Sequence, residues 1–376
     1  MVSKEVIMLL DNAFDPDFRV YKEAFCLIEL GYDVTIFSWD RECQREINEE
    51  IDGIKIKRIR TRSRFQLGIK QLLFLFLFYI KVFPSLLKVK MDVVYSHDLL
   101  MLPMGVLIKI LRGKKLVYDA HEIYWLMEKK KYNKFILGII KRLENFLIKF
   151  VNSLICVSER RASYYKQYYK KQIYVVGNYY NPIGMSQNQG IKTSEKEELR
   201  KELGIPKDKL LITYIGSFHK VRDIKLLVDY ALQNQDVFVI IAGKGYWEEY
   251  IKEAQRHCSN IIYLGWVSEP IKYYSVSDII YYVLDDNYEY NHYNAPNNLY
   301  ISIALKIPII VNMLGEAGEV VEKYGIGAII EKRDVESLKK AVDYVCENKE
   351  AIMSKFGKAQ KIYNWDTCKE RFKEAV

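Results

Sequence analysis

The chain has 376 residues, half of them hydrophobic and 28% charged, with a formal net charge of +9. That length and balance indicate a globular protein of two domains with full cores, and they exclude disordered and low-complexity chains. The six cysteines form no C-x-x-C pair and mostly stand in apolar runs. They indicate buried, reduced thiols in a cytoplasmic protein instead of a disulfide framework.

The N-terminal segment predicts a buried strand followed by a helix. Residues 5–10 read EVIMLL, an apolar run too short for a signal peptide, and a helix is expected over 18–30. Arg19 falls in the first turn of this helix, where a cation opposes the helix dipole. An anion bound beside Arg19 would explain its position, and a plain surface arginine is the alternative.

One segment, residues 54–90, carries the whole charge excess, because it contains ten basic and no acidic residues. It also contains LLFLFLFYI at 72–80, nine apolar residues that are too few to cross a bilayer. Such a segment fits the headgroup region of an anionic membrane, whereas a core helix with solvated cations is the alternative. Nucleic acid is not expected, because the aromatic residues cluster with leucines and do not alternate with the cations. The predicted membrane patch consists of Arg60, Arg62, Arg64 and Lys70.

Strands and helices alternate throughout the first half, which predicts a parallel, doubly wound sheet. The predicted strands are 5–10, 33–39, 54–59, 92–96, 115–119, 153–157 and 173–176, and the predicted helices are 18–30, 71–88, 102–111, 134–150 and 159–168.

Histidine–carboxylate pairs directly follow two of these strands. His97 with Asp98, and His121 with Glu122, occupy the carboxyl ends where open parallel sheets bind ligands. An imidazole there can orient a substrate hydroxyl or stabilise charge in a transition state. Two alternatives stay open. One is a metal site, for which no third ligand stands at a fitting spacing, and the other is a pair of histidines bonded only to backbone.

A polar stretch at 181–209 is the one convincing domain boundary, and the alternation restarts after it. Two nucleotide-fold-like domains are therefore expected to face each other across a cleft. The predicted strands of the second domain are 210–215, 236–242, 260–264, 278–283, 308–312 and 327–330, and the tail from 334 to 376 is predicted to be helical.

Glycines and cations follow the first strands of the second domain. Gly216 permits close backbone approach, and a cationic rim suited to a diphosphate comes after it. The rim consists of His219, Lys220 and Arg222. Residues 243–245 read G-K-G without a third glycine, so a dinucleotide-dependent oxidoreductase is not favoured. Residues 265–267, which end in Val267, are expected to line a base pocket.

The segment YNAPNNLYISIALKIPIIV, residues 293–311, predicts a capped helix and then a buried strand. Asn294 can cap this helix, Pro296 suits its first turn, and Pro308 ends it. The helix start offers free amides and a dipole to an anion such as a phosphate, and an ordinary crossover without a ligand is the alternative. The glycine-flanked residues 315–319 predict a second helix start that could bind an anion or a hydroxyl.

These segments together resemble glycosyltransferase family 4, whose members are retaining enzymes with the GT-B fold. The resemblance rests on DPDFRVYKEAFCLIELGYDV, SHDLLMLPMGVLIKILRGKKLVYDAHE, YIGSFHKVRDIKLL and NAPNNLYISIALKIPIIV, in that order and spacing. IYNWDTCKERF resembles the family's last helix, which returns to the first domain. The resemblance covers essentially the whole chain. It implies an α/β protein with Rossmann-like domains at 1–185, completed by about 360–376, and at 186–359.

The resemblance implies retaining transfer of a sugar from a nucleotide-sugar, UDP or GDP by preference, to a glycan or polyprenyl-linked acceptor. No metal or other cofactor is expected. With the basic segment, it implies an enzyme bound peripherally at the cytoplasmic face of the membrane. By position, His121 would contact the sugar or the reacting centre, while Lys220 and Arg222 would hold the diphosphate. The other donor-side positions are Gly216, Ser217, Val267, Asn294, Asn297, Asn298, Gly315 and Glu316. The acceptor or phosphate side consists of Arg19, His97, Asp98 and Glu122.

Three departures from the family pattern bear on activity. Ile301 stands where many members have a glutamate that grips the ribose, and Ser217 stands where they have an arginine. Asn12 and Ala13 replace the paired glycines of the first loop. The alternative function is therefore a catalytically degenerate GT-B protein that acts as a glycan- or lipid-binding partner subunit.

Overall fold

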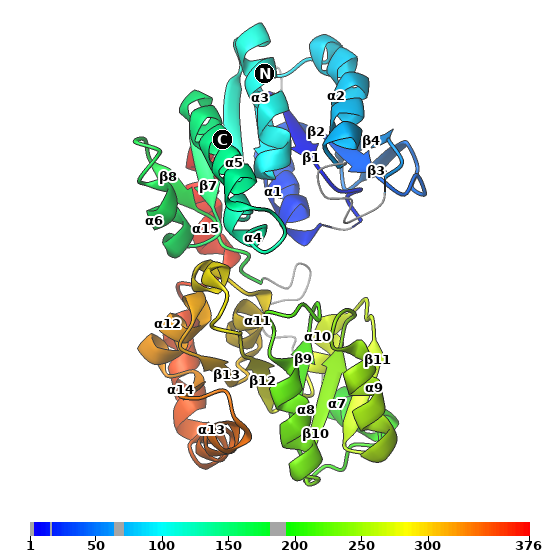
Figure 1. Cartoon of the computed structure of the whole chain (residues 1–376), viewed down its shortest axis with the longest axis vertical. Helices are drawn as coiled ribbons and strands as arrows, with labels where there is room; N and C mark the ends of the chain where they lie inside the picture. Colours follow the sequence, from blue (N-terminus) through cyan, green and yellow to red (C-terminus); the bar gives the residue numbers. More distant parts are fainter. Residues whose placement is uncertain (1–3, 16, 64–70, 181–192) are drawn as a thin grey trace. The chain divides into compact units, whose positions relative to one another are not determined.

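The structure, a computed structural model, describes residues 4–15, 17–63, 71–180 and 193–376. Contacts divide the chain into two units, Met1–Gly177 together with Cys368–Val376, and Asn178–Thr367. Each unit is built on one sheet (Figure 1). The predicted border between residues 185 and 186 lies outside the described residues.

The first unit contains an eight-stranded sheet in the order β3-β4-β2-β1-β5-β6-β7-β8. Its neighbouring strands run parallel except for β3 and β4, which are antiparallel. The central strands β1 and β5 are mostly apolar and almost entirely buried, as expected for a sheet covered on both faces. The strands are β1 (Glu5–Leu10), β2 (Asp33–Asp40), β3 (Asn48–Ile51), β4 (Ile54–Arg60), β5 (Val93–His97), β6 (Lys115–Ala120), β7 (Ser153–Cys156) and β8 (Ile173–Val175).

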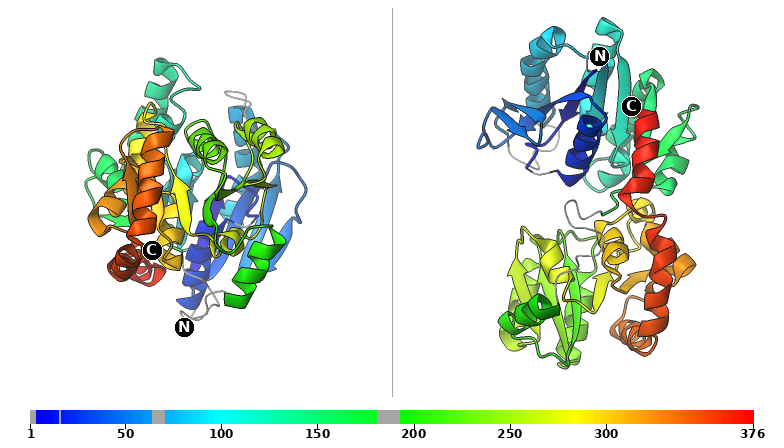
Figure 2. Two further views of the ribbon diagram at one scale, coloured as in Figure 1. Left: turned by 90° about the horizontal axis from the view of Figure 1, so that it is seen from below. Right: turned by 180° about the vertical axis from the view of Figure 1, so that it is seen from behind.

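Helices cover both faces of this sheet. Neighbouring helices α2, α3 and α5 lie over one face (Figure 1), and α1 and α15 lie over the other (Figure 2). Phe372 of α15 packs against Tyr95 with ring centroids 6.3 Å apart, so the last residues of the chain complete the first unit. The helices are α1 (Phe18–Glu29), α2 (Gln71–Lys88), α3 (Asp98–Arg112), α4 (Tyr124–Met127), α5 (Lys134–Leu147), η2 (Ile148–Phe150), α6 (Glu159–Tyr165) and α15 (Trp365–Ala375).

The second unit contains a six-stranded sheet, β11-β10-β9-β12-β13-β14, whose paired strands are all parallel. The strands are β9 (Leu210–Ile215), β10 (Val237–Ala242), β11 (Ile261–Gly265), β12 (Ile279–Tyr282), β13 (Ile309–Asn312) and β14 (Gly327–Ile330). The helices are α7 (Thr193–Glu202), α8 (Ile224–Gln233), α9 (Glu248–His257), α10 (Pro270–Tyr274), η3 (Glu289–Tyr293), α11 (Asn297–Leu305), α12 (Gly315–Tyr324), α13 (Val335–Glu347) and α14 (Lys349–Gln360).

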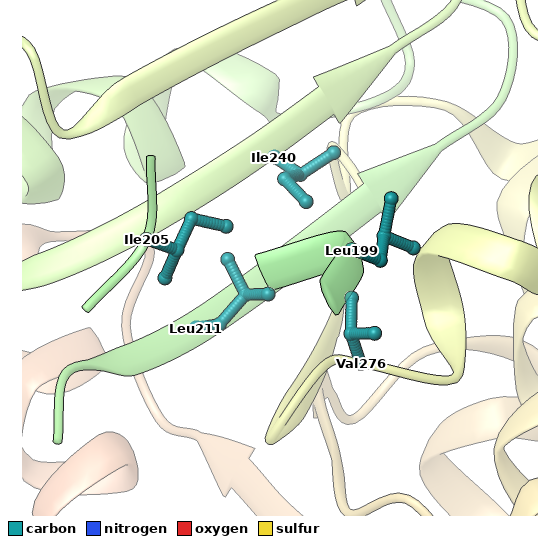
Figure 3. Close-up of a cluster of buried hydrophobic side chains, with 5 residues drawn as sticks. All are labelled: Leu199, Ile205, Leu211, Ile240 and Val276. Atoms are coloured by element: carbon teal, nitrogen blue, oxygen red, sulfur yellow. The ribbon is translucent and has the colours of Figure 1, made fainter. Parts of the chain in front are cut away.

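The helix α7 belongs to the second unit. Its Leu199 joins a buried cluster with Leu211 of β9 and Ile240 of β10, and Figure 3 shows how these side chains meet. The polar stretch that separates the two halves of the sequence therefore ends in a helix that covers the second sheet.

Besides the unpredicted short helix α4 and shifts of one to three residues at several element ends, two elements differ from the sequence predictions. The short strand β3 was not predicted, because NEEI is polar, but it pairs with β4 through a turn at Asp52 and Gly53. Both turn residues have positive φ angles, 50° and 81°, as a two-residue hairpin requires. The helix α3 begins at Asp98, four residues before its predicted start.

The helix α2 was predicted over the correct residues, 71–88, and has one covered and one open side. Phe78 stacks on Trp39 with ring centroids 5.5 Å apart, and Val82 and Leu86 are fully buried. Only 22% of the helix is buried, and among the described residues it alone is long and apolar enough to cross a membrane, with a mean hydropathy of 1.5. Because α2 contacts β4 and α3, it belongs to the layer of helices that covers the first sheet.

Candidate active site

A cluster of ionisable side chains lies at the carboxyl ends of β5 and β6. The register of the two strands places His97 opposite Asp119, and His121 follows two residues later. His121 Nε2 lies 2.8 Å from Asp119 Oδ2, and His97 Nδ1 lies 3.4 Å from the same oxygen. His121 Nδ1 lies 3.3 Å from Asp98 Oδ2 on its other side. The cluster therefore holds His121 between two carboxylates.

This arrangement keeps His121 protonated. Burial opposes the charge on the imidazole, but Asp98 and Asp119 outweigh it and raise the pKa of His121 to about 10. Burial also opposes the charge on Asp119, but Arg19 and His121 hold the pKa of that carboxyl well below its usual range. Burial lowers the pKa of His97 and raises that of Asp98 to about 7. At neutral pH His121 can stabilise negative charge, but it cannot serve as a general base.

Arg19 corrects one of the sequence predictions. Instead of facing a bound phosphate, its side chain is 7% exposed and its guanidinium is bidentate with Asp119, at 2.6 Å from Nη2 and 2.9 Å from Nε. Nη1 donates to the Val176 carbonyl at 2.7 Å, and Glu23 lies 3.1 Å from Nη2. The dipole argument was wrong here because the counterion comes from a strand a hundred residues away.

Asp98 and Glu122 take different roles at this edge. Asp98 begins α3 with a φ of 58°, and its carboxylate also accepts the backbone N–H of His121 at 3.0 Å. A non-glycine residue in this region is strained, and Asp is among the residue types that tolerate it best. Glu122 lies 2.7 Å from Nη2 of the buried Arg161, so its charge is neutralised within the first unit.

The distances alone would allow a metal ion in this cluster. Ligand atoms of His97, Asp119 and His121 all lie within 4.8 Å of one another. Both carboxylate oxygens of Asp119 already accept hydrogen bonds from Arg19, so a dication would share this carboxylate with a buried guanidinium. The charges of the cluster therefore fit a metal ion poorly.

At the carboxyl edge of the second sheet, the main chains of neighbouring strands run unusually close together. Gly216 donates its N–H to the Ala242 carbonyl at 2.9 Å, and Gly243 donates to Gly265 at 2.7 Å. A Cβ on Gly243 would lie 1.9 Å from the Gly216 oxygen, and its φ of 141° also favours glycine. The G-K-G sequence therefore allows two loops to pack together, which explains it without a dinucleotide.

Arg222 is the best-placed cation at this edge. Its N–H donates to the His219 carbonyl, and its own carbonyl accepts from the Trp247 indole, both at 2.9 Å. The guanidinium lies over the ring of Tyr282, 4.7 Å from the centroid. Its Nη1 is buried and has no hydrogen-bond partner in the described residues. The hydrogen-bonded backbone thus positions a guanidinium nitrogen whose N–H groups donate to no described residue.

The other residues predicted on the donor side of these loops are more exposed. Lys220 is exposed, and its Nζ lies over the ring of Tyr246, 4.4 Å from the centroid. Ser217 is also exposed, and its carbonyl accepts from the Tyr214 hydroxyl at 2.9 Å. Val267 is half-buried, two residues past the end of β11 and next to the exposed Trp266.

The start of α11 differs from its prediction. Pro296 precedes the first helical residue, Asn297, and supplies no side-chain cap, whereas Asn294 lies before the helix. Asn294 is buried, accepts the Tyr282 hydroxyl at 2.8 Å, and presents its carbonyl to the next helix. Asn298 donates to the Tyr274 hydroxyl at 2.8 Å and to the Ile215 carbonyl at 3.3 Å. Asn298 therefore fixes the uncapped helix start to the end of β9.

A second helix start, that of α12, lies against the same residues. Glu316 donates its N–H to the Asn294 carbonyl at 3.0 Å, and its carboxylate accepts the Tyr300 hydroxyl at 2.8 Å. A Cβ on Gly315 would lie 2.8 Å from the Asn294 and Asn291 oxygens, so only glycine fits there. The positive ends of α11 and α12 are thus brought together, and neither has a side-chain cap.

Family models match both units of the chain. The model described as glycosyl transferases group 1 matches residues 195–362, and the Glycosyltransferase Family 4 model matches residues 19–182. The chain belongs to glycosyltransferase family 4. A search of curated proteins found no matching sequence.

Solved structures show that this glycosyltransferase has the GT-B fold, as predicted. Sucrose-phosphate synthase from Thermosynechococcus elongatus has a TM-score of 0.78 at 15% identity, over 99% of this chain and 98% of the other. HepE of Anabaena, in complex with UDP and glucose, scores 0.73 at 14% identity over 99% and 98%. WaaG, a glycosyltransferase involved in lipopolysaccharide biosynthesis, scores 0.70 at 11% identity, with 99% of each chain covered.

Two residues of the candidate site were not predicted from the sequence of this glycosyltransferase. Asp119 organises the cluster of the first unit, and the sequence signal for it is an acidic residue at the end of an apolar strand. Tyr282 joins Arg222 to Asn294, and its place at the end of β12 is a similar signal. Ile301, at the position of the family's ribose-binding glutamate, is half-buried on α11.

Proposed function

We propose that this glycosyltransferase moves a hexose from a nucleotide-sugar, UDP or GDP by preference, to a glycan or polyprenyl-linked acceptor. The single observation that carries the donor assignment is Arg222, whose buried Nη1 has no hydrogen-bond partner in the described residues. A diphosphate gains negative charge as the glycosidic bond breaks. A positioned guanidinium, which Tyr282 links to Asn294 before the starts of α11 and α12, would stabilise that charge. The binding of UDP and glucose by HepE supports the same donor class.

Retention of configuration and independence of metal are part of the proposal. In the mechanism that the family resemblance implies, the acceptor attacks the same face from which the phosphate departs, and the phosphate helps to remove the acceptor proton. His121 would act in this mechanism as a cation that stabilises negative charge, because it is held protonated between Asp98 and Asp119. Such a mechanism does not require His121 to remove a proton.

We place the enzyme at the cytoplasmic face of an anionic membrane, to which it binds peripherally. Support comes from the open, apolar side of α2 and from the basic residues that precede it. Of the predicted patch, Arg60 and Arg62 are exposed, whereas Arg64 and Lys70 lie outside the described residues. Arg60 Nε lies 3.8 Å from Asp40 Oδ2, so part of its charge is balanced locally.

The test is turnover with a panel of UDP-, GDP- and ADP-sugars, measured as hydrolysis or transfer. We expect activity with at least one donor and a loss of about 100-fold or more in kcat/KM for Arg222→Ala, as for removal of one donor to a developing charge. Arg256→Ala, on the exposed side of α9, is the matched control and should keep wild-type activity. No binding and no turnover with any donor would contradict the proposal.

One observation favours a second function. Ile301 offers no acceptor to a ribose hydroxyl, and the nearby Glu316 carboxylate already accepts the Tyr300 hydroxyl. The alternative is a degenerate GT-B protein that binds a glycan or lipid and supports an active partner subunit. Calorimetry that shows no heat with UDP or GDP, together with a co-purifying active transferase, would establish this alternative instead.

A further inference from the structure

An apolar surface of the first unit extends well beyond α2. More than half of the large hydrophobic side chains that are exposed in the described residues lie on α2, α3 and α5. Monomeric soluble proteins expose single hydrophobic residues widely, but contiguous patches mark a binding surface. These three helices are neighbours in one layer, since α2 contacts α3 and α3 contacts α5 (Figure 1).

The clearest part of this surface is a stripe on α5. Its members recur at intervals of four, four and three residues, so they share one face of the helix. The stripe consists of Phe135, Ile139, Leu143 and Phe146, and Phe135 is 75% exposed. The opposite face of α5 is anchored to the sheet, because Glu144 accepts hydroxyls of Tyr118 at 2.9 Å and Tyr165 at 2.7 Å. The stripe therefore points away from the sheet.

The open sides of α2 and α3 continue this stripe. Arg112 at the end of α3 donates to the carbonyls of Leu86 and Val89 at 2.9 and 2.5 Å, which fixes the C-terminal end of α2 to α3. The exposed members on α2 are Leu72, Leu73, Phe76, Leu77, Ile80 and Leu87, and those on α3 are Leu107, Ile110 and Leu111. All three helices bury their other side on the first unit, so their apolar residues face outwards together.

The charges of this surface have one sign. The helix α2 contains no acidic residue, and the acids of the other two helices are engaged elsewhere: Asp98 pairs with His121, and Glu144 is fully buried. Exposed cations accompany the apolar residues, namely Lys81, Lys88, Lys134 and Arg142. An apolar face bordered by cations and free of exposed carboxylates is complementary to anionic lipid headgroups over an acyl layer.

We infer that α5, together with α3 and α2, docks the first unit onto an anionic lipid bilayer, with the α5 stripe as a second contact besides α2. The inference rests on the membrane partner in the proposed function and extends it to a defined face. Two separate contacts, at α2 and at α5, fix the orientation of the unit on the membrane. A single amphipathic helix would leave the unit free to rotate about that helix.

The experiment measures sedimentation of the full-length protein with vesicles of phosphatidylcholine, with and without about 30% phosphatidylglycerol. Phe135→Ser/Phe146→Ser should weaken binding to the anionic vesicles by about tenfold or more. Lys134→Gln/Arg142→Gln should weaken it roughly fivefold per cation, and only on anionic vesicles. Met353→Ser/Ile362→Ser and Arg256→Gln/Lys340→Gln, on the second unit, are the matched controls and should bind like the wild type.

Three results would overturn the inference. The first is wild-type binding by the α5 variants, which would limit the contact to α2. The second is equal binding to neutral and anionic vesicles. The third is a wild-type dimer that the α5 variants dissociate while vesicle binding persists, which would make the stripe an interface between copies. Donor hydrolysis measured without vesicles separates this inference from the proposed function, because α5-dependent binding without turnover would refute only the transfer.

Discussion

The carboxyl edges of the two sheets differ in how their charged side chains are paired. In the first unit, Asp119 is fully buried and compensates the charges of Arg19 and His121. In the second unit, Arg222 retains a nitrogen with no hydrogen-bond partner in the part of the chain that the structure describes. The charges of the first edge thus compensate one another, whereas the second edge is held by its main chain and keeps a buried guanidinium nitrogen whose donors are unused among the described residues.

Ionisable groups at strand ends therefore have two different roles in this protein. Charges that neutralise one another fix the position of a side chain, as Asp98 and Asp119 fix His121. A cation without a counterion costs stability in the free protein and becomes favourable when an anionic ligand arrives. We therefore expect variants of the first edge to change stability and variants of the second edge to change ligand binding.

The largest effect should come from Asp119→Asn, which removes the carboxylate that binds the buried guanidinium of Arg19 with both oxygens and leaves Glu23 as its one remaining acidic neighbour among the described residues. Removal of one partner from a buried ion pair costs about 3–5 kcal/mol. The free energy of unfolding of the first unit, measured by urea denaturation followed by hydrogen exchange of β5 and β6 peptides, should fall by that amount. The change keeps the shape of the side chain, so a cavity would not account for the loss.

The matched variant at the other edge is Arg222→Met, which retains much of the apolar contact with Tyr282. Because its guanidinium has no paired carboxylate among the described residues, the free energy of unfolding of the second unit should change by less than about 1 kcal/mol. We expect UDP to raise the melting temperature of the wild type but not that of this variant. Equal destabilisation by the two variants would contradict the contrast between the edges.

The next effect concerns the main chain of the second edge. Gly243→Ala places a methyl group against the Gly216 carbonyl in a backbone conformation that favours glycine, so we expect a loss of roughly 2–4 kcal/mol in the second unit. Gly138→Ala on α5 is the control, because a Cβ there meets no atom within 4 Å. It should stabilise the first unit by about 0.5–1 kcal/mol. Denaturant midpoints of the two variants test this, and a tolerated Gly243→Ala would show that the loops can separate.

Periodicity predicted most strands and helices, but it could not predict contacts between distant residues. Apolar runs predicted β1, β9 and α2 with the correct bounds, because the local pattern of hydrophobic residues determines which parts of these elements are buried. The strand β3 is polar and lies at the edge of its sheet, so its only local signal was the Asp52–Gly53 turn. Even that signal indicates a hairpin without giving the partner's register.

The candidate site was predictable as a set of strand ends, but its pairing was not. Asn294 has good capping propensity, yet it lies before the helix because Tyr282 and the N–H of Glu316 bind it there. Arg19 was assigned to an external anion because its counterion, Asp119, is remote in sequence. In both cases tertiary hydrogen bonds decided the role of a residue whose local sequence favoured another.

The smallest expected effect is a pH dependence confined to the first edge. The folded-state pKa of His121 is raised to about 10, so its contribution to stability is complete below the unfolded value near 6.5 and is lost as pH rises through 10. Burial raises the pKa of Asp98 to about 7, which also lowers stability as pH rises towards neutrality. Between pH 7 and 9.5 the His121 contribution should fall by about 2–3 kcal/mol. Glu23 and Lys22, whose pKa values are both shifted to about 8, titrate in the same range, so a variant is needed to separate their effects.

His121→Gln isolates that contribution. The glutamine can bond to one carboxylate but carries no titratable charge, so the fall in the first unit's stability between pH 7 and 9.5 should be smaller than in the wild type. Hydrogen exchange read from β5 and β6 peptides measures the change, and peptides from β9 and β10 serve as the internal reference. An equal pH dependence in wild type and variant would mean that His121 is not held as an imidazolium. The ion pairs of His121 with Asp98 and Asp119 would then be weaker than their distances indicate.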